Sequence, residues 1–135
     1  MKNILALLTF VFLSSCILFS QTNHNSTIED YKKEIIGTWE LEKDSRTKII
    51  FSKNGKCYDY SDGKLDKTYY YSINTTSPQC SEKVPVGELY SYLKITNIKD
   101  PKDIYEYEIN GLNKEILYLD YQRNLNTKLS KYTRQ

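Results

Sequence analysis

Beyond residue 35, apolar and polar residues alternate along the chain in the pattern of β-strands. The alternation is clearest at 104–109, where Tyr105, Tyr107 and Ile109 alternate with Glu106 and Glu108. Successive side chains of a strand point to opposite faces, so one face of this strand is apolar. The same pattern predicts eight strands, at 38–42, 48–51, 57–61, 68–73, 89–98, 104–109, 115–121 and 127–134. We find no convincing helical period and expect an all-β domain.

Turn signals between these strands indicate how they are connected. Two-residue hairpin turns favour an asparagine or aspartate followed by glycine. Three such dipeptides lie at the ends of predicted strands: Asn54-Gly55, Asp62-Gly63 and Asn110-Gly111. Eight short strands with tight turns leave no room for crossover connections. The sequence therefore predicts a single small, closed, antiparallel up-and-down barrel.

The first twenty residues have the pattern of a bacterial export signal. Lys2 precedes an almost continuous apolar run at 4–13, which is too short to span a membrane. Cleavage after Ser20 would leave Gln21 as the first residue of a periplasmic or extracellular protein. Alternatively, residues 13–16 fit a lipobox, so that residues 1–15 would be removed and Cys16 would anchor a lipoprotein in the outer membrane. We expect export by either route.

Length and charge limit what the exported part can be. Removal of the signal leaves 115 of the 135 residues, which we divide into a flexible leader at 21–34 and a barrel domain at 35–135. A chain of this size supports one modest core. The whole chain has 19 Lys and Arg against 17 Asp and Glu, a net charge of +2, and removal of Lys2 with the signal leaves a net charge near +1. This balance does not indicate a nucleic-acid partner, and we expect a monomer without a membrane span.

Two positions near the ends of the predicted barrel carry a family resemblance. Gly37-Thr38-Trp39 opens the first strand with the only tryptophan, and a basic residue, Arg134, lies on the last strand. Together with the meander of strands, these residues resemble the lipocalin-like proteins of the calycin superfamily. The resemblance implies that Arg134 packs on Trp39 and closes one end of the barrel. Such a cation–π contact contributes roughly 0.5–2 kcal/mol.

The tyrosines are the candidates for a ligand pocket. Thirteen tyrosines all lie beyond residue 30, and we assign six of them to the barrel interior as candidate pocket lining. These are Tyr58, Tyr60, Tyr69, Tyr71, Tyr105 and Tyr107. Eight-stranded barrels either fill with side chains or hold one small ligand. A continuous apolar cavity of about 300 Å³ or more would indicate a ligand-binding barrel, and a solid interior would exclude one.

Two functional hypotheses follow. In the first, the barrel holds a small hydrophobic or amphipathic ligand. In the second, the interior is solid and the loop at 77–88, with its two prolines, binds an envelope protein or inhibits an enzyme. The fold resemblance motivates the first hypothesis, and the length and stiffness of the loop motivate the second.

The cysteines and ionisable residues suggest structural roles and no enzyme. Cys57 and Cys80 are an even pair in an exported domain, which predicts a disulfide worth roughly 3 kcal/mol, with two free thiols as the alternative. The only histidine, His24, lies in the predicted leader, where nothing would orient it for catalysis. Asp59 and Asp66 belong to an acidic hairpin whose spacing does not match a calcium loop. We expect no catalytic residue, metal or cofactor.

Overall fold

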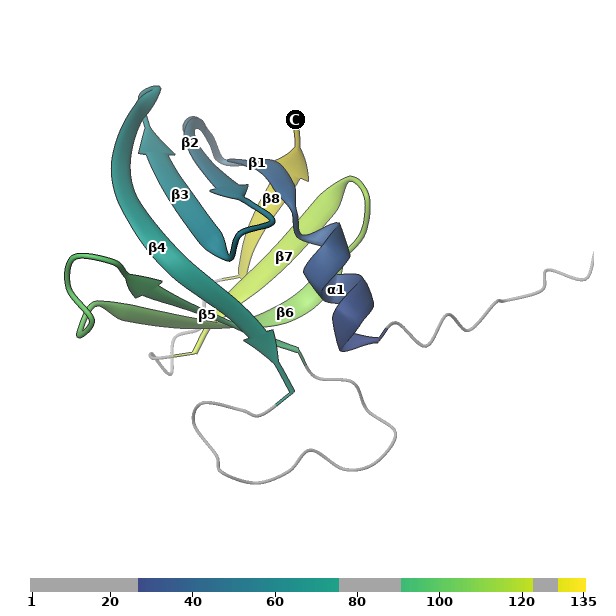
Figure 1. The fold of residues 1–135 in the computed structure, drawn as a ribbon. Helices are drawn as coiled ribbons and strands as arrows, with labels where there is room; N and C mark the ends of the chain where they lie inside the picture. The colour runs from purple at the N-terminus through teal and green to yellow at the C-terminus, as the bar shows by residue number, and fades with distance from the viewer. Residues whose placement is uncertain (1–26, 76–90, 123–128) are drawn as a thin grey trace, which may run out of the picture.

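The computed structural model describes residues 27–75, 91–122 and 129–135. Within these ranges one helix precedes eight strands: α1 (Ile28–Glu34), β1 (Gly37–Leu41), β2 (Asp44–Phe51), β3 (Lys56–Ser61), β4 (Lys64–Asn74), β5 (Tyr92–Asn97), β6 (Ile104–Leu112), β7 (Ile116–Tyr121) and β8 (Leu129–Arg134). Each strand pairs antiparallel with the next, and β8 pairs with β1, so the sheet closes into a barrel (Figure 1). The predicted all-β up-and-down barrel is confirmed.

Two of the predicted hairpin turns lie where the sequence placed them. Gly55, with φ +78°, lies in the β2–β3 turn, and Asp62 and Gly63 have φ values of +51° and +72° in the β3–β4 turn. In the β3–β4 turn, both central residues have positive φ. This is the geometry of a type I′ turn, which matches the right-handed twist of the flanking strands.

The turn predicted at Asn110-Gly111 is wrong. β6 continues through both residues to Leu112, and its pairing with β7 shifts register between Ile109 and Gly111. The chain turns instead after Asn113, whose side-chain oxygen accepts hydrogen bonds from the backbone N–H groups of Glu115 and Ile116, both at 2.8 Å. The Asn-Gly pair lies at a bulge, which also favours glycine.

The prediction that the chain lacks a helix is wrong at α1, which lies within the segment expected to be a flexible leader. Thr27 and Asp30 form a reciprocal capping box at its N-terminus, which satisfies backbone donors that a helix end leaves unpaired. Ile28 and Tyr31, three residues apart and therefore on one face, pack against the barrel core. The helix is a single short amphipathic segment of seven residues, too brief for its periodicity to stand out.

The core fills the end of the barrel next to α1, which we call the closed end. Trp39, at the start of β1, is fully buried there, and its cross-strand neighbour on β8 is Arg134. The largest fully buried apolar side chains belong to one cluster with it: Ile35, Phe51, Leu93, Leu117 and Leu119. We call the opposite end, which carries the β1–β2, β3–β4 and β5–β6 turns, the mouth.

Among the described residues, no helix combines the length and apolar character that a membrane crossing needs.

Candidate functional site

Trp39 and Arg134 form the contact that closes the barrel beside α1. The guanidinium carbon of Arg134 lies 4.3 Å from the centroid of the Trp39 ring. Trp39 Nε1 donates a 2.7 Å hydrogen bond to the carbonyl of Ile35. Arg134 Nη1 donates to the carbonyl of Ile36 at 2.9 Å, and Nη2 donates to the carbonyl of Glu34. The two side chains therefore tie β8 and β1 to the end of α1, which is a structural role.

Gly37 makes room for this contact. Its φ of +147° lies in a region that L side chains rarely adopt, and an added Cβ would lie 2.7 Å from Arg134 Nη1. Only glycine leaves both the backbone conformation and the path of the guanidinium open. The Gly-x-Trp sequence thus contributes two parts of one contact: space for the arginine and a ring for it to cover.

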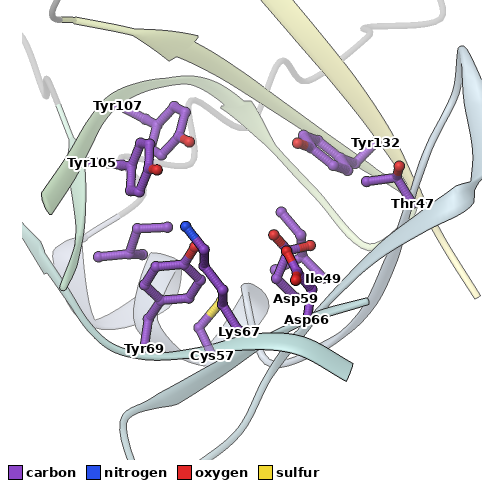
Figure 2. Close-up of a pocket in the computed structure, with 11 residues that line it drawn as sticks. Thr47, Ile49, Cys57, Asp59, Asp66, Lys67, Tyr69, Tyr105, Tyr107 and Tyr132 are labelled. Carbon is purple, nitrogen blue, oxygen red and sulfur yellow. The ribbon is translucent and has the colours of Figure 1, made fainter. Parts of the chain in front are cut away.

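The other half of the barrel contains a cavity of about 220 Å³, which we call the mouth cavity. Figure 2 shows its side chains arranged around the barrel interior. It is lined by Thr47, Ile49, Cys57, Asp59, Asp66, Lys67, Tyr69, Ile95, Tyr105, Tyr107 and Tyr132. Because Asp66 is exposed, the cavity reaches solvent at the mouth. Its volume is below the roughly 300–1,000 Å³ of pockets for drug-sized ligands, so only a compact ligand would fit.

Half of the six tyrosines assigned to the pocket line the mouth cavity. Tyr69, Tyr105 and Tyr107 do so. Tyr71 is on the inward face of β4 but lies deeper, edge-to-face with Phe51 at 5.1 Å, and its hydroxyl donates to the carbonyl of Ser52. It packs against the core and does not line the cavity.

The assignment of Tyr58 and Tyr60 to the interior is wrong. Cys57 pairs with the buried Phe51 across the β2–β3 hairpin, and cross-strand partners share a face. Cys57 and Asp59 therefore point into the barrel, and the tyrosines that alternate with them point outward. The tyrosines of this strand were placed inward by the parity of its alternation, which does not itself say which face is buried; the hairpin register decides it.

Sequence reasoning did not place Asp59, Asp66 and Lys67 in a pocket. Asp59 pairs with Lys67 and Tyr60 pairs with Leu65, so Asp66 is an extra residue on β4. Such a β-bulge interrupts the strict alternation of a strand. Two consecutive residues, Asp66 and Lys67, consequently both line the mouth cavity. The sequence shows an acidic hairpin, but it does not predict the bulge that brings Asp66 into the lining of the cavity.

The carboxylates of the cavity differ from each other in their environment. Burial raises the pKa of Asp59, and the neighbouring charge of Asp66 raises it further. Asp103 lies beside the cavity, where hydrogen bonds from Asn97 and Lys67 lower the pKa of its carboxyl. Lys67 Nζ lies 3.2 Å from Asp103 Oδ2. Lys67 is thus bonded to Asp103, and its charge only partly offsets the burial and the Asp66 charge that raise the pKa of Asp59.

The tyrosine hydroxyls and the thiol stay neutral at physiological pH. Burial raises the pKa of Tyr132 to about 12 and also raises the pKa values of Tyr69 and Tyr107. Cys57 is buried, and burial raises the pKa of its thiol. A thiol that stays protonated is a poor nucleophile.

Several expected features lie outside the described residues. Cys80, His24, the export signal with Cys16 and the loop at 77–88 all belong to this part of the chain. The disulfide between Cys57 and Cys80 therefore stays a prediction. Within the described ranges, no three His, Cys, Asp or Glu side chains are grouped so that they could hold a metal ion.

Comparisons with known proteins gave no match, whether to a protein-family model, a curated protein or a solved structure.

Proposed function

We propose that this chain is an exported, non-catalytic barrel of the lipocalin-like, calycin type that binds a compact amphipathic ligand in its mouth cavity. The observation that carries the proposal is the uneven filling of the barrel. Large apolar side chains pack the closed end, whereas about 220 Å³ remains open at the mouth. A barrel of eight strands has room for one small ligand.

The lining of the mouth cavity favours an amphipathic ligand over a purely hydrophobic one. Asp59, Asp66 and Lys67 bring charge into it, and four tyrosines bring ring surface with polar tips. A purely apolar ligand would desolvate the carboxylates of Asp59 and Asp66 without offering them hydrogen-bond donors, which costs free energy. A ligand with one polar end and a short carbon skeleton would meet both parts of the lining.

The calycin assignment rests on the closed end. Trp39 at the start of β1 and Arg134 on β8 are stacked at 4.3 Å, with Gly37 leaving space for the guanidinium. This is the arrangement that the family resemblance implies, on a barrel with the matching strand order. The alternative, an interaction module acting through the loop at 77–88, required a solid interior. The mouth cavity is smaller and more polar than the apolar cavity of about 300 Å³ set as the criterion for a ligand-binding barrel. It therefore supports the binding of a compact ligand and no larger one.

Native mass spectrometry of the protein purified from its own host tests the proposal. We expect a small-molecule mass retained by the wild type and lost in Thr47→Trp, because a bulky ring at this lining position fills the mouth cavity. Lys48→Trp is the matched control, since Lys48 is the next residue of β2 and pairs on the outer face with Glu40 at 3.2 Å. No retained mass in the folded wild type, or equal retention in both variants, would contradict the proposal.

The route of export has its own measurement. The intact mass of the protein extracted from its host distinguishes a chain that begins at an acylated Cys16 from one that begins at Gln21. A mass that still includes residues 1–15 would contradict both routes.

A further inference from the structure

The side chains that line the mouth cavity carry more negative than positive charge. Asp59, Asp66 and Lys67 are the charged residues that line it, and the single ammonium group among them is engaged by Asp103 at 3.2 Å. No salt bridge within 27–75, 91–122 and 129–135 includes Asp59 or Asp66. An ionised carboxylate accepts several hydrogen bonds, so Asp59, which lines the cavity, offers acceptor capacity toward it.

Aromatic rings form the wall on the β6 side of the cavity. Tyr105 and Tyr107 lie together on β6, and Tyr69 stands edge-on to Tyr105 with ring centroids 6.1 Å apart (Figure 2). The electron-rich faces of such rings attract cations, and the attraction strengthens where water is excluded. A partly buried carboxylate and tyrosine rings around one small space are a combination that suits an organic cation.

Other ligand classes fit the lining less well. A metal ion would need several oxygen or nitrogen ligands at short distance, and the described residues contain no group of three acidic, histidine or cysteine side chains that could supply them. An anion would meet Asp59 and Asp66 and would have to displace Asp103 from Lys67. A neutral ligand would add no positive charge beside Asp59, whose neighbour Lys67 is shared with Asp103.

We propose that the mouth cavity binds a compact primary amine, whose ammonium group contacts the carboxylate of Asp59 and whose carbon skeleton lies against the rings of Tyr105 and Tyr107. This inference rests on the proposed function and names the ligand class of the same cavity. An ammonium group supplies three N–H donors, for which Asp59 and Asp66 provide acceptors of opposite charge. Asp66, exposed at the mouth, is the first of the two that an entering amine would meet.

Pairs of probes that differ only in the charged group test the ligand class. We would titrate the full protein by calorimetry with tyramine and with its neutral counterpart 2-(4-hydroxyphenyl)ethanol, and likewise with butylamine and butanol. We expect each amine to bind at least about tenfold more tightly than its alcohol, a difference of about 1.4 kcal/mol. In Asp59→Asn this preference should disappear, whereas Glu106→Gln, which removes a carboxylate from the outer face of β6, should retain it.

The rings can be tested separately from their hydroxyl groups. Tyr107→Phe keeps the ring and should bind amines within about twofold of the wild type, whereas Tyr107→Leu should weaken amine binding by about fivefold or more. Thermal denaturation of each variant verifies that it is folded. Equal loss in the two variants would show that the hydroxyl group carries the contact and would overturn the role of the ring.

The outcomes separate this inference from the proposed function. If amines and alcohols bind equally well, the proposed preference for an amine is wrong, but the proposal of a ligand-binding barrel stands. If no probe binds but the protein retains another small molecule from its host, the amine proposal is again wrong and the ligand-binding proposal stands. If no probe binds and no molecule is retained, both proposals fail.

Discussion

The guanidinium of Arg134 crosses Gly37 so closely that a Cβ there would lie 2.7 Å from Nη1. At this scale each residue of the closed end depends on another, because the same guanidinium also stacks on Trp39 and donates to two carbonyl groups. Arg134→Met removes the charge and all of these hydrogen bonds. We expect a loss of about 2 kcal/mol and a melting temperature lower by roughly 5–10 °C, measured by circular dichroism. An unchanged melting temperature would contradict the structural role of the arginine.

Gly37→Ala should be costly for two separable reasons. The backbone φ of +147° is unfavourable for alanine in any background, but the clash of its Cβ exists only while Arg134 is present. We therefore expect Gly37→Ala to cost about 1 kcal/mol more in the wild type than in Arg134→Met, measured as a double-mutant cycle in urea. An equal cost in both backgrounds would show that Arg134 moves aside freely.

At the scale of elements, α1 depends on its capping box. Thr27 accepts from the backbone N–H of Asp30 at 3.3 Å and donates its hydroxyl to the Asp30 carboxylate at 2.8 Å. Thr27→Ala should weaken the helix by about 1 kcal/mol, which speeds hydrogen exchange of the Ile35 amide about fivefold. Ile35 N–H is bonded to the carbonyl of Tyr31 and reports on the last turn. Thr27→Ser is the control and should exchange like the wild type; equally fast exchange in both would contradict the cap.

The bulge of β4 makes a distinct prediction. Because Asp66 has no partner between the pairs Asp59–Lys67 and Tyr60–Leu65, its deletion should leave a regular hairpin with every existing pair intact. We expect the deletion variant to fold with a melting temperature within a few degrees of the wild type and with weaker amine binding. Deletion of Lys94 is the control. β5 pairs without interruption on both sides at that position, so this deletion should prevent folding.

The strands also show which parts of the fold and of the cavity could be predicted from the sequence. Alternation and Asn-Gly or Asp-Gly turns predict eight strands in order, since both depend on local chemistry. The direction in which β3 faces depends on the pairing of Cys57 with Phe51, and the position of Asp66 depends on a bulge. Both are properties of two strands together, and no single-strand pattern contains them. For that reason three tyrosines of the cavity were predicted and its carboxylates were not.

At the scale of the whole molecule, the carboxylates act on stability with opposite signs. Hydrogen bonds lower the pKa of Asp103, so its contribution is present above the unfolded value of about 3.8 and is lost as the pH falls through the folded value. Burial raises the pKa of Asp59. Its folded form binds protons more tightly than the unfolded chain, so stability decreases as the pH rises from 3.8 through that raised pKa.

Asp59→Asn should therefore make the protein more stable at neutral pH while removing the charge that we propose for ligand recognition. The gain should be absent below a pH of about 3.8, where the wild-type carboxyl is protonated in both states, and should grow to a plateau above the folded pKa. Urea denaturation from about pH 3 to pH 7 measures it. Asp103→Asn should show the opposite sign over this range. A gain that is constant with pH would show that the Asp59 charge is not its cause, whereas a growing gain coupled to weaker amine binding would mean that the molecule keeps a destabilising charge for its ligand.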